Sequence, residues 1–352
     1  MTDRAGARLE LTRDRILAHR RRAGALDERL PPGPDSLRRA VWAGAQDSVP
    51  RSALLSLHAR VMGVGPDALD DPSLVQVWGP RYTAYVVAAQ DVAVFTRGRL
   101  ADAGPRRRRA EDHARRLQAF LDGRRMPYGD AGRGVGVNPN ALRYAAPTGT
   151  VRIRWDGARQ PVVWTVPAPE IDPPDARLEL ARRYLHVLGP ATAISFADWA
   201  GIPTPVGPAT FDALGGSLMP VRTPIGDAWI LASDEASFLA PAEPPAPARL
   251  LPSGDVLYLL GGADRELLVP EPDRRARLWT PRVWPGAVLV GGEVIGTWRR
   301  AEAAVTIEPW RSLSGSERRA VEAEAASLPI PGEAGRIRVA WAGEERPQLW
   351  AK

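Results

Sequence analysis

Apolar side chains recur along this chain at two different spacings, and each spacing predicts one kind of element. Residues 106–122 carry an apolar side chain every three or four positions, which predicts a long amphipathic helix. These positions are Ala110, Ala114, Leu117 and Leu121. Asn138 and Pro139 then predict the start of a short helix, because asparagine caps a helix well and proline fits its first turn. Two β-rich runs, 150–155 and 161–166, follow with a turn signal between them and predict a hairpin.

The order of helices followed by a hairpin recurs in residues 169–240. Helical patterns cover residues 175–188, 190–201 and 208–214, and a two-stranded ribbon is predicted around residues 224–227. Three helices followed by a ribbon is the arrangement of a winged helix-turn-helix, which binds DNA through its last helix. A small α+β unit without DNA-binding function can show the same order, so this alternative stays open.

The two ends of the chain have mixed patterns. Near the N-terminus, Leu9, Leu11, Ile16 and Leu17 predict the apolar side of a helix whose arginines form its polar remainder. A helix at 54–61 and strands at 75–78 and 82–87 follow. The proline-rich run PAEPPAP at 241–247 predicts a stiff linker. Beyond it, strand-like runs, the first of them at 250–260, lead to a closing helix at 316–328. We therefore expect an α+β fold of four parts, with boundaries 1–104, 105–168, 169–240 and 248–352.

Composition excludes several chemistries. The 352 residues include no cysteine, which excludes disulfides and thiolate metal sites. The four histidines lie far apart in sequence, so we expect no metal and no cofactor. The longest apolar run, Ala84 to Ala89, is far too short to span a membrane. These features predict a soluble, cytoplasmic protein with no membrane partner.

Positive charge predicts an anionic partner. The net charge is +6, and 46 of the 47 basic residues are arginines, whose planar side chain suits phosphate. Residues 105–125 hold eight arginines against three acidic residues. A helix with this charge would contact a DNA backbone, and Arg106, Arg107 and Arg108 are our candidate contacts. A solvated helix face is the alternative interpretation of such a run.

Several short motifs, in order, carry a resemblance to a known family. The segment at 44–60 reads GAQDSVPRSALLSLHAR, and the later segments read WGPRYTAYVV at 78–87, LGPAT at 188–192, RLLPSGDVLYLLG at 249–261 and VLVGGEVIGTWRR at 288–300. Together they resemble the bacterial winged-helix DNA glycosylase superfamily over nearly the whole chain. The resemblance implies tandem winged-helix units in a C-shaped array, a C-terminal β-rich, barrel-like part, and duplex DNA on a basic concave face.

The resemblance also implies a site. The resemblance implies that catalytic members excise N-alkylated purines by hydrolysing the N-glycosidic bond without a metal. They use a Gln-x-Gln or Gln-x-Asp pair near the anomeric carbon, where positive charge develops. Here Gln46 stands at the first position and Ser48 at the second, and Asp47 between them could supply the acid if the turn shifts by one residue. These polar residues could instead only bind the start of the next helix. The other candidate DNA contacts in these motifs are Arg51, Arg81, Tyr85, Arg282, Trp284, Arg299 and Arg300.

The sequence is compatible with three functions. The first is a monofunctional DNA glycosylase that removes alkylated purines, acting as a monomer in association with the nucleoid. The second is a catalytically inactive relative that binds duplex DNA as a regulator or damage-recognition module. The third is a protein-interaction scaffold that binds no DNA.

Tyr85 and Trp284 could equally be core residues, because most of the 12 tryptophans and their aromatic neighbours must pack inside.

Overall fold

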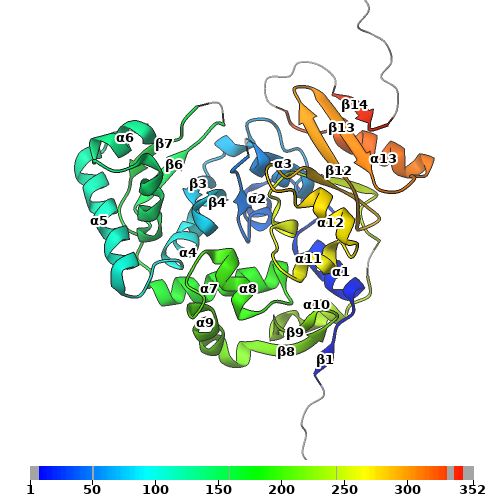
Figure 1. Ribbon diagram of the computed structural model, residues 1–352, viewed down its shortest axis with the longest axis horizontal. Coiled ribbons are helices and arrows are strands. Elements are labelled where there is room, and N and C mark those ends of the chain that lie inside the picture. The colour runs from blue at the N-terminus through cyan, green and yellow to red at the C-terminus, as the bar shows by residue number, and fades with distance from the viewer. Residues whose placement is uncertain (1–7, 50, 158, 243, 331–336, 344–352) are drawn as a thin grey trace, which may run out of the picture.

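The computed structural model describes residues 8–330 and 337–343, apart from 50, 158 and 243, and the chain forms a mixed α+β fold with three sheets. Figure 1 shows helices α5 and α6 at one edge, the strands of the C-terminal sheet at another, and helices α7–α9 along a third. Among the described residues, no helix combines the length and apolar character that crossing a membrane requires. Within the same ranges, no three His, Asp or Glu side chains gather closely enough to share a metal ion.

The largest sheet has six strands, in the order β2-β4-β3-β6-β7-β5. The β3–β4 hairpin from the first part of the chain joins the β6–β7 hairpin through the pair Gln76 and Ile153, so the predicted boundary near residue 104 separates segments that share one sheet. The strands are β2 (Ala45–Gln46), β3 (Leu74–Trp78), β4 (Ala84–Ala88), β5 (Met126–Pro127), β6 (Val151–Arg154) and β7 (Val162–Thr165).

Two of the helices around this sheet are elements that the sequence pattern predicts. Helix α5 (Gly104–Leu121) buries all four of its predicted apolar positions, and the short 3₁₀ helix η4 (Pro139–Thr148) begins at the predicted cap, Asn138. The glycine-rich stretch between them, which we did not predict as helical, forms α6 (Tyr128–Gly134). The remaining helices around the sheet are α2 (Pro34–Ala40), α3 (Ser52–Arg60) and α4 (Val92–Arg97).

Residues 173–239 show the predicted winged-helix order of elements. Helices α7 (Pro173–Leu188), α8 (Ala193–Ala200) and α9 (Val206–Leu214) precede the hairpin of β8 (Leu218–Thr223) and β9 (Gly226–Leu231), and α10 (Glu235–Leu239) closes the unit. Strand β1 (Leu9–Glu10), from the N-terminal segment, pairs in parallel with β8 and completes this sheet. Two segments more than 200 residues apart in sequence therefore build one unit.

Helix α1 (Arg13–Ala23) lies beside α10 and α11 and corrects one expectation (Figure 1). Its arginines are not all solvated, because Arg20 is 1% exposed. The Arg20 guanidinium donates to the carbonyl oxygens of Gly189 and Pro190 and to Asp264 at 3.1–3.3 Å. A buried guanidinium needs such acceptors, and all three come from distant parts of the chain.

The C-terminal part is β-rich but its described strands form an open sheet, so the barrel-like expectation is wrong. The order β10-β11-β12-β13-β14 has two unjoined ends. Helix α13 (Gly315–Ala326) packs against it at the place of the predicted closing helix and starts at the capping residue Ser314. The predicted strand at 250–260 stops at Leu251, where a turn leads into a 3₁₀ helix at Val256–Tyr258. The other elements are β10 (Ala248–Leu251), α11 (Asp264–Leu268), α12 (Pro272–Leu278), β11 (Gly286–Val290), β12 (Glu293–Ala301), β13 (Ala304–Pro309) and β14 (Arg338–Trp341).

Candidate active site

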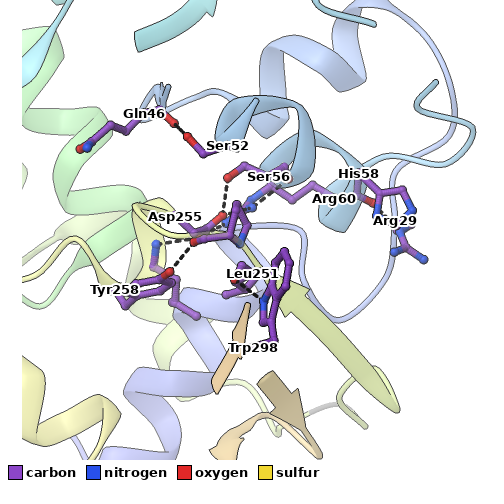
Figure 2. Close-up of polar contacts among 12 residues, drawn as sticks. Arg29, Gln46, Ser52, Ser56, His58, Arg60, Leu251, Asp255, Tyr258 and Trp298 are labelled. Atoms are coloured by element: carbon purple, nitrogen blue, oxygen red, sulfur yellow. Dashed lines mark hydrogen bonds and ion pairs between the residues drawn. The ribbon is translucent and has the colours of Figure 1, made fainter. Parts of the chain in front are cut away.

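Gln46 and Ser48 lie together at the edge of the six-stranded sheet. Gln46 ends the short strand β2, where it pairs with Tyr85 of β4. The Gln46 Nε2 atom donates to Ser48 Oγ, and Gln46 Oε1 accepts a hydrogen bond from Arg81 Nη2 at 3.0 Å. The Gln46 backbone carbonyl accepts from Ser52 Oγ at 2.7 Å, which ties the strand to the start of α3 (Figure 2). The half-buried amide is thus held from two sides while Ser48 stays exposed.

Asp47 is separated from this pair. It is 1% exposed, and its carboxylate accepts from the backbone N–H of Ala53 at 3.1 Å and from Gln76 Nε2 at 2.9 Å. Successive side chains in extended backbone point in opposite directions, which is why Asp47 faces inward where Gln46 and Ser48 face outward. Burial raises the pKa of the Asp47 carboxyl to about 7. In this conformation the Asp47 side chain binds the first turn of α3 and is not available on the outer face with Gln46 and Ser48.

Tyr85 lies in the core, which removes it from our candidate DNA contacts. Its side chain is 0% exposed. Two glycines make room for the ring, because a Cβ atom at Gly44 or Gly79 would lie 2.8–2.9 Å from Tyr85 carbon atoms. The close approach of these two backbone segments holds β2 and the turn after β3 in place. Tyr85 therefore helps to position Gln46, because the two residues pair in neighbouring strands β2 and β4. The buried ring of Tyr85 is not accessible to DNA.

A buried ion pair attaches α3 to the C-terminal part of the chain. Asp255 accepts from both Nη atoms of Arg60, at 2.7 and 2.8 Å, and from Ser56 Oγ at 2.7 Å (Figure 2). Arg60 and Asp255 are each 1% exposed. This ion pair holds the turn before Asp255 next to Gln46 and Ser48. A Cβ atom on Gly254, in that turn, would lie 3.4 Å from Gln46 Nε2. The sequence motif at 249–261 contained this aspartate, but nothing in the spacing showed that it would meet α3.

A cavity of about 310 Å³ opens next to the loop that follows Ser48. Four of our candidates belong to its surroundings: Trp284, Arg299 and Arg300 line it, and Arg282 is exposed next to its lining residue Val283. Val49 and Ser52 line its other side. The ring of Trp284 is half-buried and tilts against Tyr258, with centroids 6.3 Å apart, while Trp279 is 9% exposed and belongs to the core. The structure therefore gathers three sequence-predicted residues beside the motif, although the Trp284 side chain is half-buried.

The remaining candidates lie elsewhere. Arg51 precedes α3 with a φ of 63° and is half-buried. Arg106 and Arg108 are exposed on α5, and Arg107 forms an ion pair with Glu111 at 2.8 Å. Figure 1 shows α5 at the edge of the molecule away from the C-terminal sheet. The arginines of α5 therefore lie on a different part of the fold from the candidates next to the C-terminal sheet.

Comparison with known proteins identifies this arrangement. A model of the family described as DNA glycosylase AlkZ-like matches residues 37–329. The chain belongs to the AlkZ-like DNA glycosylase family. The interstrand DNA cross-link repair glycosylase of Streptomyces sahachiroi is 27% identical over 190 residues, an alignment that spans 51% of this chain and 51% of that protein.

The fold of this AlkZ-like chain also matches a solved structure. The S. sahachiroi DNA glycosylase AlkZ superposes with a TM-score of 0.76 and 20% sequence identity, over 95% of this chain and 100% of that one. The three-sheet α+β architecture described above is therefore an AlkZ-like fold. It places the motif Gln46-Asp47-Ser48 of this family member at the junction of α3, the β3–β4 turn and the segment before Asp255.

Proposed function

We propose that this protein is a monofunctional DNA glycosylase that hydrolyses the N-glycosidic bond of alkylated purines in duplex DNA. The observation that carries the proposal is the pair of Gln46 and Ser48, held on one outward face with the amide oriented by Arg81. Membership of the AlkZ-like DNA glycosylase family supports the reaction class. The arginines near the pair and on α5 supply the charge that duplex DNA requires.

The chemistry follows from the charges of the reaction. An alkylated purine carries a positive charge, so its bond to C1′ breaks with the electron pair leaving on the base, and positive charge moves to the sugar. A group that offers oxygen lone pairs beside C1′ stabilises that charge. Gln46 Oε1 and Ser48 Oγ offer such lone pairs and can hold a water that adds to C1′. The water then gives up a proton to solvent.

The serine at position 48 lowers the rate of base release that we expect. A hydroxyl at the second position can orient water but accepts a proton far less readily than a carboxylate. Asp47, the neighbouring carboxylate, is buried and bonded to Ala53 and Gln76. We therefore expect slower catalysis than a carboxylate at position 48 would give, with the departing cationic base providing most of the driving force.

A single-turnover assay of base release tests the proposal. The substrate is duplex DNA with N7-methylguanine, and the variants are wild type, Gln46→Ala and, as a control on a distant helix, Arg319→Ala. Release that disappears in Gln46→Ala but persists in the control supports the glycosylase. Since the S. sahachiroi relative is named for cross-link repair, a duplex with an N7-linked interstrand cross-link serves as the second substrate.

The second candidate function, a DNA-binding protein without catalysis, is favoured by one specific observation. The face that carries Gln46 has a serine where the implied pattern places Gln or Asp, and the nearest carboxylate in sequence is buried. Tight, salt-dependent binding of duplex by wild type, without release from either substrate, would establish this function and refute the glycosylase. Absence of duplex binding would refute both.

A further inference from the structure

Arg81 sits in a strained turn that directs it toward Gln46. Arg81 and its neighbour Tyr82 have φ angles of 52° and 59°, a left-handed conformation that L-residues rarely adopt. Such a conformation costs free energy and persists only where the surrounding structure supports it. Gly201, at the end of α8, leaves room for this turn, because a Cβ at that position would lie 2.8 Å from the Arg81 backbone nitrogen. The fold thus maintains a costly turn at the residue that contacts Gln46.

Arg81 also lines a second cavity, of about 490 Å³, on its other side. The start of α8, the β8–β9 turn and the segment 259–267 form the other walls, and Arg265 of α11 is the second arginine of the lining. The Arg265 guanidinium lies 4.8 Å from the ring centroid of Trp279 and 5.4 Å from that of Trp284, and its Nε donates to the Leu260 carbonyl at 2.9 Å. Stacking on two rings fixes this side chain in place.

The positive charge of these two arginines is not matched in the part of the chain that the structure describes. Neither Arg81 nor Arg265 forms an ion pair with a described carboxylate. Of the three carboxylates that line the cavity, Asp264 pairs with Arg20 at 3.1 Å, and Asp227 pairs with Arg222 at 3.1 Å. Only the exposed Asp198 is left to offset two guanidinium groups. Burial lowers the pKa of Arg265, and the positive charge of Arg81 lowers it further.

We propose that Arg81 and Arg265 together bind one phosphate of the DNA backbone, and that Arg81, shared between this phosphate and Gln46, is a positioning residue for the Gln46 amide. An arginine pair with free N–H donors is suited to a phosphate oxyanion. A bound phosphate would also neutralise Arg81, whose charge otherwise opposes the positive charge that develops on the sugar. The phosphate site goes beyond the proposed function. The positioning role of Arg81 rests on the proposed function, because it concerns the rate of base release.

The phosphate site is tested by equilibrium binding to unmodified duplex DNA, which needs no catalysis. We expect Arg265→Ala to bind about five- to tenfold more weakly than wild type at moderate salt, and the slope of log affinity against log salt to fall by about 0.9. Arg319→Ala is the control, because Arg319 is exposed on α13 and also loses one positive charge. An Arg265→Ala protein with the affinity and salt slope of the control would overturn the phosphate site.

A second arm identifies the source of the phosphate. Inorganic phosphate and a nucleoside monophosphate are titrated into wild type and Arg265→Ala, with thermal unfolding as the readout. No stabilisation at millimolar concentration, together with the expected loss of duplex affinity, supports a DNA phosphate. Stabilisation that needs Arg265, with unchanged duplex affinity, would assign the site to a free phosphate compound and overturn the proposal.

The positioning role of Arg81 is tested by single-turnover release at saturating protein. Without the Arg81 donor the Gln46 amide can rotate, so we expect Arg81→Ala to lower the saturated rate about tenfold or more, and Arg81→Lys to restore part of it. The control Arg319→Ala, exposed on α13, should leave the saturated rate unchanged. Equal saturated rates in wild type and Arg81→Ala would overturn the positioning role. If wild type releases no base, the proposed function and the positioning role fail together, while the binding titration still decides the phosphate site.

Discussion

Removal of the Asp255 carboxylate should destabilise the protein strongly and disturb the Gln46 region at the same time. Asp255 accepts four hydrogen bonds, two from Arg60, one from Ser56 and one from the backbone N–H of Leu257. In Asp255→Ala, the Ser56 carbonyl, at 2.9 Å, is the one partner that the 1%-exposed Arg60 keeps among the described residues. An uncompensated buried charge of this kind costs about 3–5 kcal/mol. Against a typical total stability of about 5–15 kcal/mol, this is a large fraction.

Urea unfolding followed by tryptophan fluorescence measures this loss, and a matched variant separates charge from packing. The double variant Arg60→Met with Asp255→Leu removes both charges, and we expect it to recover most of the lost stability, because an apolar pair of similar volume often replaces a buried ion pair at little cost. A loss below about 1 kcal/mol in Asp255→Ala, or a double variant as unstable as the single one, would refute the reasoning.

Three further predictions concern the site, its pH dependence and the basic helix. Ser48→Asp should raise the single-turnover rate of base release about tenfold, since a carboxylate accepts a proton more readily than a hydroxyl; an unchanged or lower rate contradicts the role of position 48. Burial raises the pKa of the Asp47 carboxyl to about 7 in the folded protein, above the ordinary value of an aspartate. The contribution of Asp47 to stability is therefore present at low pH and is lost as pH rises from about 4 to 7. The difference in free energy of unfolding between wild type and Asp47→Asn should therefore fall across this window, and a flat difference would contradict the assignment. Replacing the exposed Arg106 and Arg108 with alanine should lower the salt slope of duplex binding by about 2, measured by titration at several salt concentrations, whereas an unchanged slope would remove α5 from the interface.

The elements that local spacing predicts agree well with the structure. The apolar side of α5, the cap at Asn138 and the order α7, α8, α9 and hairpin follow from residues near one another in sequence. The glycine-rich α6 was missed, because its glycines are poor helix formers and neighbouring elements stabilise it. The barrel-like expectation failed because local patterns predict strands but not whether the two ends of a sheet meet.

The sequence by itself determined the type of most elements, the excess of positive charge and the motif that contains Gln46, because these depend on residue identity and short spacing. Only the tertiary structure decided which groups surround that motif. Arg81 lies 35 positions from Gln46 in sequence and contacts it in a turn that packs against Gly201. Gly254 lies 208 positions from Gln46 and is held next to it by the Arg60–Asp255 ion pair. Burial likewise placed Asp47 and Tyr85 in the interior, where neighbours from other segments satisfy or enclose them. Such long-range contacts depend on how all the elements pack together, and no local pattern of residues specifies them.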